Sequence, residues 1–421
     1  MIDLIEKSLK SLKRIYGSDE QLLQKQITRY EKLVEDFANQ FGEKPKSIFT
    51  APGRTEICGN HTDHNNGKVM AASIDLDTIA AVRTSDNKIR IKSEGFDPLF
   101  EVALDKLEKI PEEEGTTNSL IRGIAAKFKA LNFKIGGFDA YLSSQVGIGS
   151  GLSSSASIEV MIGTILNHLY NDGKISPVKI AQIGQFAENE YFGKPCGLMD
   201  QLAIAVGGML EIDFKNQEPK IIETDFDQEK ADFAIIIVDT GGNHADLTHN
   251  YAAIPQEMKA VASYFGKESC RNLDMNTVLD NMSDLRDKAG DRAILRCLHF
   301  LNENRRVDQL AETIARVDYD QFLKIIKKSG NSSFKYLQNC YPEQEPDDQG
   351  ISLALALTEH FIRKNNCRGA SRVHGGGFAG TIQAFIEREY TAEYIGFMEN
   401  IFGKNSLTKV RIRDVGGVKI I

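Results

Sequence analysis

The segment GIGSGLSSSASIEVMIGTILNHLY, residues 147–170, decides how the rest of this sequence is interpreted. Its first five residues include three glycines, and three consecutive serines precede a long apolar run. Glycine permits positive φ and lets backbone N–H groups approach a ligand closely. The free N–H groups at the start of a helix favour an anion, commonly a phosphate. The segment therefore predicts a phosphate-binding turn, with the hydroxyls of Ser153, Ser154 and Ser155 as further donors or as ligands of a phosphate-bound metal ion.

A flexible turn with a serine helix cap is the simpler alternative for the same residues. A strand-like segment, GGFDAYLSSQV, precedes the turn and an apolar helix follows it, which favours the phosphate loop. Two common phosphate loops do not fit. No lysine follows the glycines, as a P-loop requires, and serines stand where the Rossmann fingerprint has its third glycine. We therefore expect a different kind of phosphate loop.

Strands and helices alternate along the chain on both sides of this loop. Residues 1–42 predict two helices, and residues 47–94 predict strands. A helix is expected over residues 117–132, begun by Thr117 or Asn118, and another over residues 176–193, with Ser176 as its cap and Pro177 at its first position. Further on we expect strands in GGMLEIDF and ADFAIIIVDTG, helices over residues 245–365, a glycine turn feeding a strand, a helix in TAEYIGFMENIFG, and a β segment in TKVRIRDVGGVKII. The pattern predicts an α/β or α+β protein.

Length and composition narrow the class of protein. A chain of 421 residues exceeds the ~250–300 at which single cores stop growing, so two domains are expected, with a boundary near residue 215. The net charge of −8 argues against nucleic acid or an anionic membrane as partner. Six scattered cysteines without a CxxC pair, and an N-terminus without an uninterrupted apolar run, predict a cytoplasmic protein with reduced thiols.

A second polar segment, GRTEICGNHTDHNNG, spans residues 53–67. It combines two histidines, two acids, an arginine and three asparagines. Imidazoles beside a carboxylate suit a transition metal, so HTDH raises the hypothesis of a metal site. A polar loop with capping asparagine and aspartate side chains is the alternative. No HExxH motif accompanies the segment, and its residues alone leave both interpretations open.

Four segments together resemble a known family. APGRTEICGNHTDHNNG resembles the galactokinase signature, and GIGSGLSSSAS resembles the ATP loop of the GHMP kinases. AENEYFGKPCGLMDQLA resembles the galactokinase segment with the catalytic aspartate, and RVHGGGFAGTIQAF resembles the third, glycine-rich motif. All four occur in family order. The resemblance implies an α+β, two-domain GHMP kinase fold, with a ribosomal protein S5 domain 2-like N-terminal domain (residues 1–215, of which 1–42 are a helical lead-in) and a ferredoxin-like C-terminal domain (residues 216–421) whose last strand returns to the first domain.

The resemblance implies an ATP-dependent sugar-1-kinase, a galactokinase that phosphorylates the anomeric hydroxyl of α-D-galactose with Mg-ATP. Asp200 falls on the catalytic aspartate and Arg54 on the arginine that stabilises phosphoryl charge, although such a pair could also be a plain salt bridge. Ser155 and Glu188 fall on the ligands of Mg²⁺, while Glu190 is expected to be ordinary surface. The implied ATP-binding residues are Gly147, Gly149, Ser150, Gly151, Leu152, Ser153, Ser154 and Ser155. The expected partners are ATP and a small sugar, with a monomer or weak homo-oligomer as the assembly.

The implied sugar-binding residues are Asn60, His61, Asp63, Gly197 and Tyr251. At position 60 the family has a glutamate that contacts the C6 hydroxyl, so the loss of charge raises the hypothesis of an acidic sugar such as galacturonate, or of N-acetylgalactosamine. Three further departures are His64 in place of a tyrosine, AAIPQ in place of arginines after Tyr251, and Ala379 in place of a glycine. A non-catalytic sensor of sugar and ATP is the alternative from another class. The intact serine loop, Arg54, Glu188 and Asp200 favour the enzyme.

Overall fold

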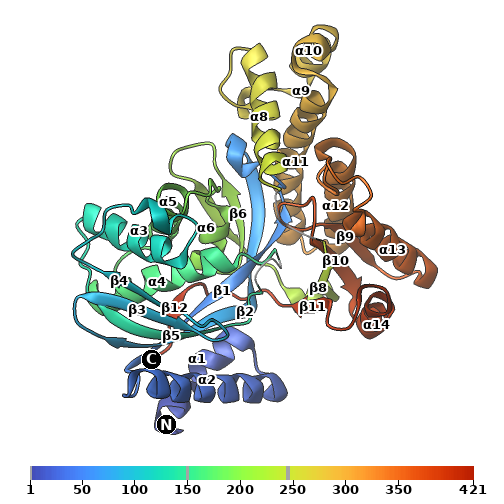
Figure 1. Cartoon of the computed structure of the whole chain (residues 1–421). Coiled ribbons are helices and arrows are strands. Elements are labelled where there is room, and N and C mark those ends of the chain that lie inside the picture. Colours follow the sequence, from blue (N-terminus) through green and yellow to red (C-terminus); the bar gives the residue numbers. More distant parts are fainter. Residues whose placement is uncertain (1, 148–150, 243–246) are drawn as a thin grey trace.

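The computed structural model describes residues 2–147, 151–242 and 247–421. It is an α+β structure organised around two sheets (Figure 1). The α-helices are α1 (Ile2–Tyr16), α2 (Glu20–Phe41), α3 (Thr117–Ala130), α4 (Ser154–Tyr170), α5 (Pro177–Phe186), α6 (Met199–Val206), α7 (Gln228–Ala231), α8 (Thr248–Tyr264), α9 (Met275–Asp280), α10 (Met282–Ala289), α11 (Asp291–Ala315), α12 (Tyr319–Ser332), α13 (Gly350–Asn365) and α14 (Thr391–Phe402). The strands are β1 (Ser47–Cys58), β2 (Lys68–Thr84), β3 (Lys88–Ser93), β4 (Leu99–Ala103), β5 (Phe138–Ser144), β6 (Met209–Asp213), β7 (Lys220–Thr224), β8 (Phe233–Asp239), β9 (Gly369–Val373), β10 (Thr381–Glu387), β11 (Leu407–Val410) and β12 (Val418–Lys419).

The first sheet has eight strands and is centred on β1 and β2. Its order is β12-β1-β2-β5-β3-β4. The N-terminal half of β2 pairs with β6 in place of β5, and β6 pairs with β7. All pairs are antiparallel except β3 with β5. The β1–β2 register shifts between Pro52 and Arg54 and again between Glu56 and Cys58. Such irregularities re-aim side chains, and here they fall where the polar segment begins.

Both faces of this sheet are covered by helices because its strands alternate apolar side chains between the faces. Phe49, Ala80 and Val82 pack against the core beneath α3, α4, α5 and α6. Ile48, Ile79 and Ala81 point the other way, onto α1 and α2. Figure 1 shows α1 and α2 below the sheet, and α3, α4, α5 and α6 above it. The predicted N-terminal helix pair therefore forms the second cover of the sheet.

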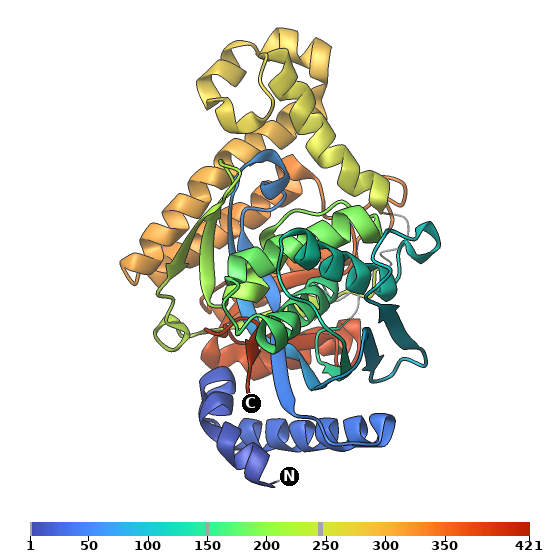
Figure 2. The ribbon, with the colours of Figure 1, turned by 90° about the vertical axis from the view of Figure 1, so that its left-hand side faces the viewer.

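The second sheet has four antiparallel strands in the order β11-β8-β10-β9. Strand β8 is apolar from Phe233 to Val238 and packs on both faces. Phe233 and Ile235 contact the side of α11 and α12, whereas Ala234 and Ile236 contact the side of α13 and α14. Helices α8, α9, α10 and the start of α11 extend away from this sheet (Figure 2). The predicted α+β class and the helix-rich second half are confirmed.

Local signals were uneven guides to the element boundaries. Helix α5 begins as predicted, with Pro177 at its first turn and the Ser176 side chain accepting from Lys179 N. Helix α3 begins at Thr117, as predicted, and Thr116 precedes it as the N-cap residue. Strands β4 and β7 were not predicted. Residue 215, near which the domain boundary was predicted, lies between β6 and β7, which pair with each other in the first sheet, and the boundary stays a prediction. Among the described residues, no helix combines the length and apolar character needed to cross a membrane.

Candidate active site

Arg54 and Asp200 form the centre of the candidate site. Arg54 lies in β1 directly after a register shift, and Asp200 lies in the first turn of α6. Nε of Arg54 donates to Oδ1 of Asp200 at 2.6 Å, and Nη2 donates to Oδ2 at 2.7 Å. A two-point pair of this kind fixes orientation as well as distance. The fold thus joins two residues that are 146 positions apart in the sequence.

The surroundings of Asp200 favour its charged form. Burial alone would raise the pKa of Asp200, but the Arg54 guanidinium and the Ser153 hydroxyl bring this pKa below its usual range. The start of α6 adds the positive end of a helix dipole. The Asp200 side chain is still 30% exposed, whereas Arg54 is 7% exposed. Asp200 is therefore an oriented, ionised carboxylate that a ligand can reach.

Three residues of the predicted phosphate loop, Gly151, Leu152 and Ser153, lie against this pair; we call residues 147–155 the serine loop. Arg54 Nη1 donates to the carbonyl of Gly151, the Arg54 backbone N donates to the carbonyl of Leu152, and the Ser153 hydroxyl donates to Asp200. Ser153 has φ of 61° and caps α4, which begins at Ser154. A left-handed serine is costly for an ordinary turn and often marks a functional one. Gly147 is described, while Gly149 and Ser150 lie outside the described residues.

Gly151 brings the third glycine-rich motif to the same place. It has φ of 70°, and a Cβ there would lie 2.8 Å from Thr381 Oγ1 and 3.1 Å from His374 Nδ1. His374 in turn contacts the Thr55 hydroxyl at 3.0 Å. Burial and the nearby Arg54 and Arg372 charges depress the pKa of His374, so this ring is neutral. The motifs that the sequence separates widely therefore meet around Arg54.

Ser155 and Glu188 provide two neighbouring oxygen ligands beside this centre. The Ser155 hydroxyl donates to Oε1 of Glu188 at 3.2 Å, and Glu188 is buried at the start of the π-helical turn η3 (Ala187–Phe192). Gln201 Nε2 donates to Oε2 of Glu188 at 2.9 Å and so fixes the carboxylate. One serine and one glutamate suit Mg²⁺, which takes few protein oxygens and completes its shell with phosphates and water. Glu190 is exposed, as expected.

A transition-metal site at HTDH is not supported. Within the described ranges, no group of three or more His, Cys, Asp or Glu side chains is placed to hold a metal ion. His61 Nε2 lies 2.8 Å from the carbonyl of Gly376. Burial is the largest of the effects that lower the pKa of His61 to about 4. The ring is therefore neutral, and Nε2 carries the hydrogen that this carbonyl accepts.

Asp63 and Gly197 meet next to the Arg54–Asp200 pair. A Cβ on Gly197 would lie 1.9 Å from Oδ2 of Asp63, so only glycine fits beside this carboxylate. The charge of Asp63 also reaches Arg54, where it is one of the effects that raise the guanidinium pKa. The Asp63 carboxylate thus lies where the polar segment, residues 53–67, meets the segment that carries Gly197 and Asp200.

Tyr251 approaches from α8 and rests on the glycine loop, residues 375–377. Its hydroxyl donates to the carbonyl of Gly377 at 3.2 Å, and a Cβ on Gly376 would lie 2.5 Å from its ring. The Tyr251 and His61 rings are 6.3 Å apart and nearly parallel. Burial raises the pKa of Tyr251 to about 12, so the phenol keeps its hydrogen. Tyr251 and His61 are therefore held by the same loop.

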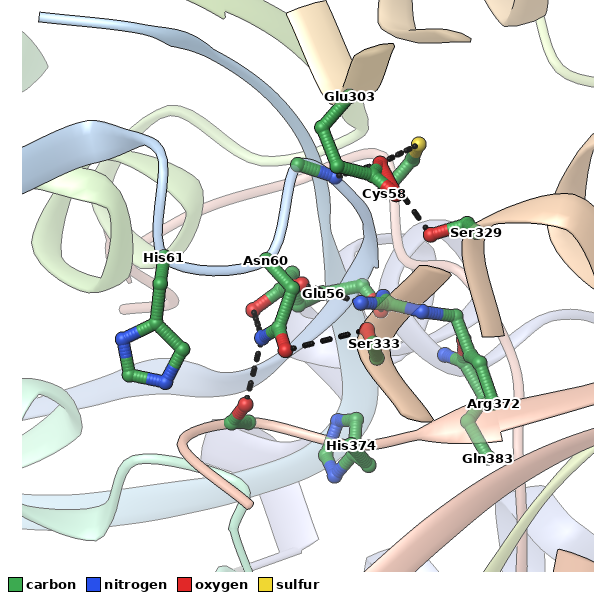
Figure 3. Close-up of polar contacts among 12 residues, drawn as sticks. Glu56, Cys58, Asn60, His61, Glu303, Ser329, Ser333, Arg372, His374 and Gln383 are labelled. Atoms are coloured by element: carbon green, nitrogen blue, oxygen red, sulfur yellow. Dashed lines mark hydrogen bonds and ion pairs between the residues drawn. The ribbon is translucent and has the colours of Figure 1, made fainter. Parts of the chain in front are cut away.

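Asn60 occupies a different environment from the other predicted sugar residues. It is 1% exposed and hydrogen-bonded within the protein, beside Glu56 and Arg372 (Figure 3). Glu56 and Arg372 were not predicted as part of the site. The sequence offered one signal for this pair, a charged side chain within a segment with a strand pattern. Arg372 lies 316 positions from Glu56, so the sequence could not show that the two side chains meet.

The three other departures from the family pattern lie at the edge of the site. His64, Pro255 and Gln256 line a cavity of about 280 Å³ between α8 and the loop that joins β1 to β2, residues 59–67, here called the signature loop. Ala379 is 4% exposed and packs in the apolar core around α8, with Leu247 and Phe378. Its additional methyl group therefore enters a core and leaves the Arg54–Asp200 pair unobstructed.

Comparison with known proteins gives consistent results. The profile named "Galactokinase galactose-binding signature" matches residues 35–84, and the "GHMP kinases N terminal domain" matches residues 119–208. A curated galactokinase of Clostridium tetani is 28% identical over 361 residues, covering 85% of this chain and 88% of that protein. The solved galactokinase of Lactococcus lactis, complexed with galactose, superposes with a TM-score of 0.78 at 24% identity, covering 93% of this chain and 99% of that one. A mevalonate kinase of Methanococcus jannaschii gives a TM-score of 0.61 at 17% identity, covering 87% and 98%.

Proposed function

The chain belongs to the GHMP kinase family and carries the galactokinase signature, and from this premise we propose that it transfers the γ-phosphoryl group of ATP to the anomeric hydroxyl of α-D-galactose. It is a sugar kinase, a phosphotransferase with an alcohol group as acceptor. The observation that carries the proposal is the two-point Arg54–Asp200 pair beside the start of α4, with Ser155 and Glu188 next to it. The eight-stranded sheet with its helices would form the nucleotide-binding domain, and the four-stranded sheet would form the second.

The proposed roles follow from charge and position. Phosphoryl transfer passes through a loose transition state in which the attacking hydroxyl loses its proton late. A carboxylate of lowered pKa suits this task, because Asp200 orients the sugar hydroxyl first and accepts its proton only as the new bond forms. Arg54 would hold Asp200 and stabilise the negative charge of the phosphoryl group. The start of α4 would receive the phosphates.

Ser155 and Glu188 would hold the Mg²⁺ ion. When bound, this ion would supply positive charge that offsets the negative charge of the phosphates. Gln201 would keep the Glu188 carboxylate turned toward Ser155, as its 2.9 Å hydrogen bond supports.

Galactose is the sugar that we propose. Asp63, next to Gly197, would bind two neighbouring sugar hydroxyls, and His61 and Tyr251 would line the same side. The galacturonate hypothesis rested on the lost charge at Asn60. In the structure, however, Asn60 is 1% exposed and is hydrogen-bonded within the protein, to Oε2 of Glu56 at 3.1 Å among others, so the missing charge gives no specific support for either alternative sugar. We therefore carry neither galacturonate nor N-acetylgalactosamine forward as a second candidate.

A panel of sugars with Mg-ATP tests the proposal. Galactose, N-acetylgalactosamine, galacturonate, arabinose and glucose are compared by product formation, and galactose should give the highest kcat/KM. Asp200→Ala should lower turnover by about 10²–10⁴-fold, the usual contribution of a proton-transferring group, while ATP binding by calorimetry stays close to wild type. Asp139→Ala, which removes a buried carboxylate bonded to Arg83 and Arg90 at a distant strand, is the control for general damage.

Three results would change this assignment. Binding of galactose and ATP without any product would identify a sensor instead of an enzyme. Undiminished turnover in Asp200→Ala would remove Asp200 from the mechanism. A higher kcat/KM for another sugar would keep the kinase and replace galactose as its acceptor.

A further inference from the structure

Asn60 has every polar atom of its side chain occupied by the protein. Nδ2 donates to Oε2 of Glu56 at 3.1 Å and to the carbonyl of Gly375 at 2.8 Å. Oδ1 accepts from Asn339 Nδ2 at 2.8 Å and from the Ser333 hydroxyl at 3.5 Å. An amide offers two donor hydrogens and one acceptor oxygen with two lone pairs. With these partners in place, it has nothing left to offer a sugar hydroxyl.

The carboxylate beside Asn60 is itself fixed from the other sheet. Arg372, in β9, donates to Oε1 of Glu56 at 2.6 Å and to its backbone carbonyl at 2.9 Å. The side chains are 0% and 3% exposed for Arg372 and Glu56. Figure 3 shows Asn60 and Glu56 side by side, with Arg372 approaching from the opposite direction. A buried pair with such short contacts holds β1 at a fixed distance from β9.

Asn60, Glu56 and Arg372 together contact both segments that would hold the sugar, the signature loop and the glycine loop. Asn60 immediately precedes His61, which has φ of 57°, and Asn60 binds the carbonyl of Gly375. His61 and Tyr251 bind the next two carbonyls of the glycine loop, those of Gly376 and Gly377. The backbone carbonyl of Asn60 also receives a hydrogen bond from His299 at 3.0 Å. Any shift of Asn60 would therefore move the signature loop against the glycine loop.

We infer that Asn60, with Glu56 and Arg372 behind it, is a positioning residue that sets the signature loop relative to the glycine loop, and that it does not contact the C6 end of the sugar. The inference rests on the proposed kinase function and deepens it. Substrate selection at C6 then depends on the shape of the loops that this group holds together. The side chain at position 60 acts on the sugar only through His61, Asp63 and Tyr251.

A comparison of two sugars separates the two roles of Asn60. D-galactose and 6-deoxy-D-galactose differ only in the C6 hydroxyl. Asn60→Ala should lower kcat/KM for both sugars by the same factor, on the order of 10²-fold, as expected when reacting groups are displaced by about 1 Å. The KM for ATP should stay unchanged. The same comparison is made with sugar dissociation constants from calorimetry, so it does not depend on turnover.

Asn167→Ala is the matched control, because Asn167 is also a buried asparagine, 5% exposed, with its amide bonded to the backbone of Ile175 at 3.0 Å. It should lower the melting temperature and leave the kinetics of both sugars near wild type.

Asn60→Asp is the second variant, because it keeps the size of the side chain and removes both donors. Adding Glu56→Gln to Asn60→Asp restores a donor between the two positions and should recover part of the lost kcat/KM.

Three outcomes would overturn the inference. A loss in Asn60→Ala that is large for galactose and absent for 6-deoxygalactose would show a direct contact with C6. Unchanged kinetics in both Asn60 variants would remove any positioning role, as would an equal loss in Asn167→Ala. If the wild type binds both sugars but phosphorylates neither, the proposed kinase function fails while the binding comparison still decides the role of Asn60.

Discussion

Two arginine–carboxylate pairs lie close together in this molecule, and we propose different roles for them. Arg54–Asp200 and Arg372–Glu56 both have a closest contact of 2.6 Å. The pKa of Asp200 is lowered, whereas burial outweighs Arg372 and raises the pKa of Glu56. Asp200 receives two bonds from Arg54 and one from Ser153, and it stays partly exposed. The number of partners and the access of water, more than distance, therefore distinguish the Arg54–Asp200 pair, which we propose to be the reactive pair, from the structural pair Arg372–Glu56.

Breaking the structural pair should have the largest effect on stability. Arg372→Ala leaves Glu56 as a buried charge without its arginine, so we expect a loss of about 3–5 kcal/mol in the free energy of unfolding. Denaturant titration measures this loss. The control is Arg286→Ala, which removes an exposed pair with Asp291 and should change stability very little. Equal losses in both variants would contradict the comparison, and Glu56→Ala added to Arg372→Ala should recover part of the stability.

Weakening the reactive pair should instead lower turnover. Arg54→Lys keeps the charge and loses the two-point contact with Asp200, so kcat at saturating ATP and galactose should fall by about 10²–10³-fold. Steady-state kinetics and a melting curve on the same sample make the measurement. Arg83→Lys is matched to it, because Arg83 also binds a buried aspartate, Asp139, away from the site. A kcat of Arg54→Lys within threefold of wild type would make this pair structural as well.

The sugar side of the reactive pair is tested through Gly197. In Gly197→Ala the new methyl group would lie 1.9 Å from Oδ2 of Asp63, so the carboxylate must move. Overpacking of this kind typically costs about 1–3 kcal/mol, and we expect a ten- to hundredfold rise in the KM for galactose with an unchanged KM for ATP. Gly396→Ala, where a Cβ meets no atom within 4 Å, is the control. An unaltered KM for galactose would place the sugar elsewhere.

Acidification should lower the stability of the protein by a smaller amount, through the buried histidines around the glycine loop. The pKa of His61 is lowered to about 4, and burial also lowers the pKa of His299 and His374. Between pH 6.5 and 4 the unfolded chain binds protons that the folded chain does not, so stability falls as the pH falls. His61 alone should contribute roughly 1 kcal/mol of loss by pH 5.5.

Melting curves from pH 7.5 to 5.5 measure this effect. The slope should be shallower in His61→Gln, and kcat measured below the melting temperature should not follow the protonation of Asp200, whose pKa lies lower. Stability independent of pH over this range would show that the histidines around the glycine loop bind protons in the folded protein over the same pH range as in the unfolded chain.

The sequence predicted features that depend on neighbouring residues. Ser176 and Pro177 begin α5 because a cap and a first-turn proline act locally. The serine loop before α4 was visible for the same reason, since glycines and serines act on the adjacent backbone. Strand β7 was missed because it is short and mostly exposed, so it has no apolar alternation to detect.

The environment of Asn60 could not be predicted, because its partners come from distant parts of the chain. The resemblance implied a side chain facing the sugar, yet Gly375, Asn339 and Ser333 surround it from more than 270 positions away. The spacing of Glu56 and Asn60 is the one local clue. It does not distinguish between an amide that meets a ligand and one that bridges two strands.

Strand β12 has a consequence for how this protein is made. Phe49 and Thr50, near the start of the first sheet, pair with Lys419 and Val418. During synthesis that edge of β1 therefore stays unpaired until residues about 370 positions later have been made, and the closure of so long a loop is slow. Until then an apolar strand presents unpaired backbone groups to other chains. Shortening the chain before Val418 should therefore lower the soluble yield more than it lowers the activity of the molecules that fold.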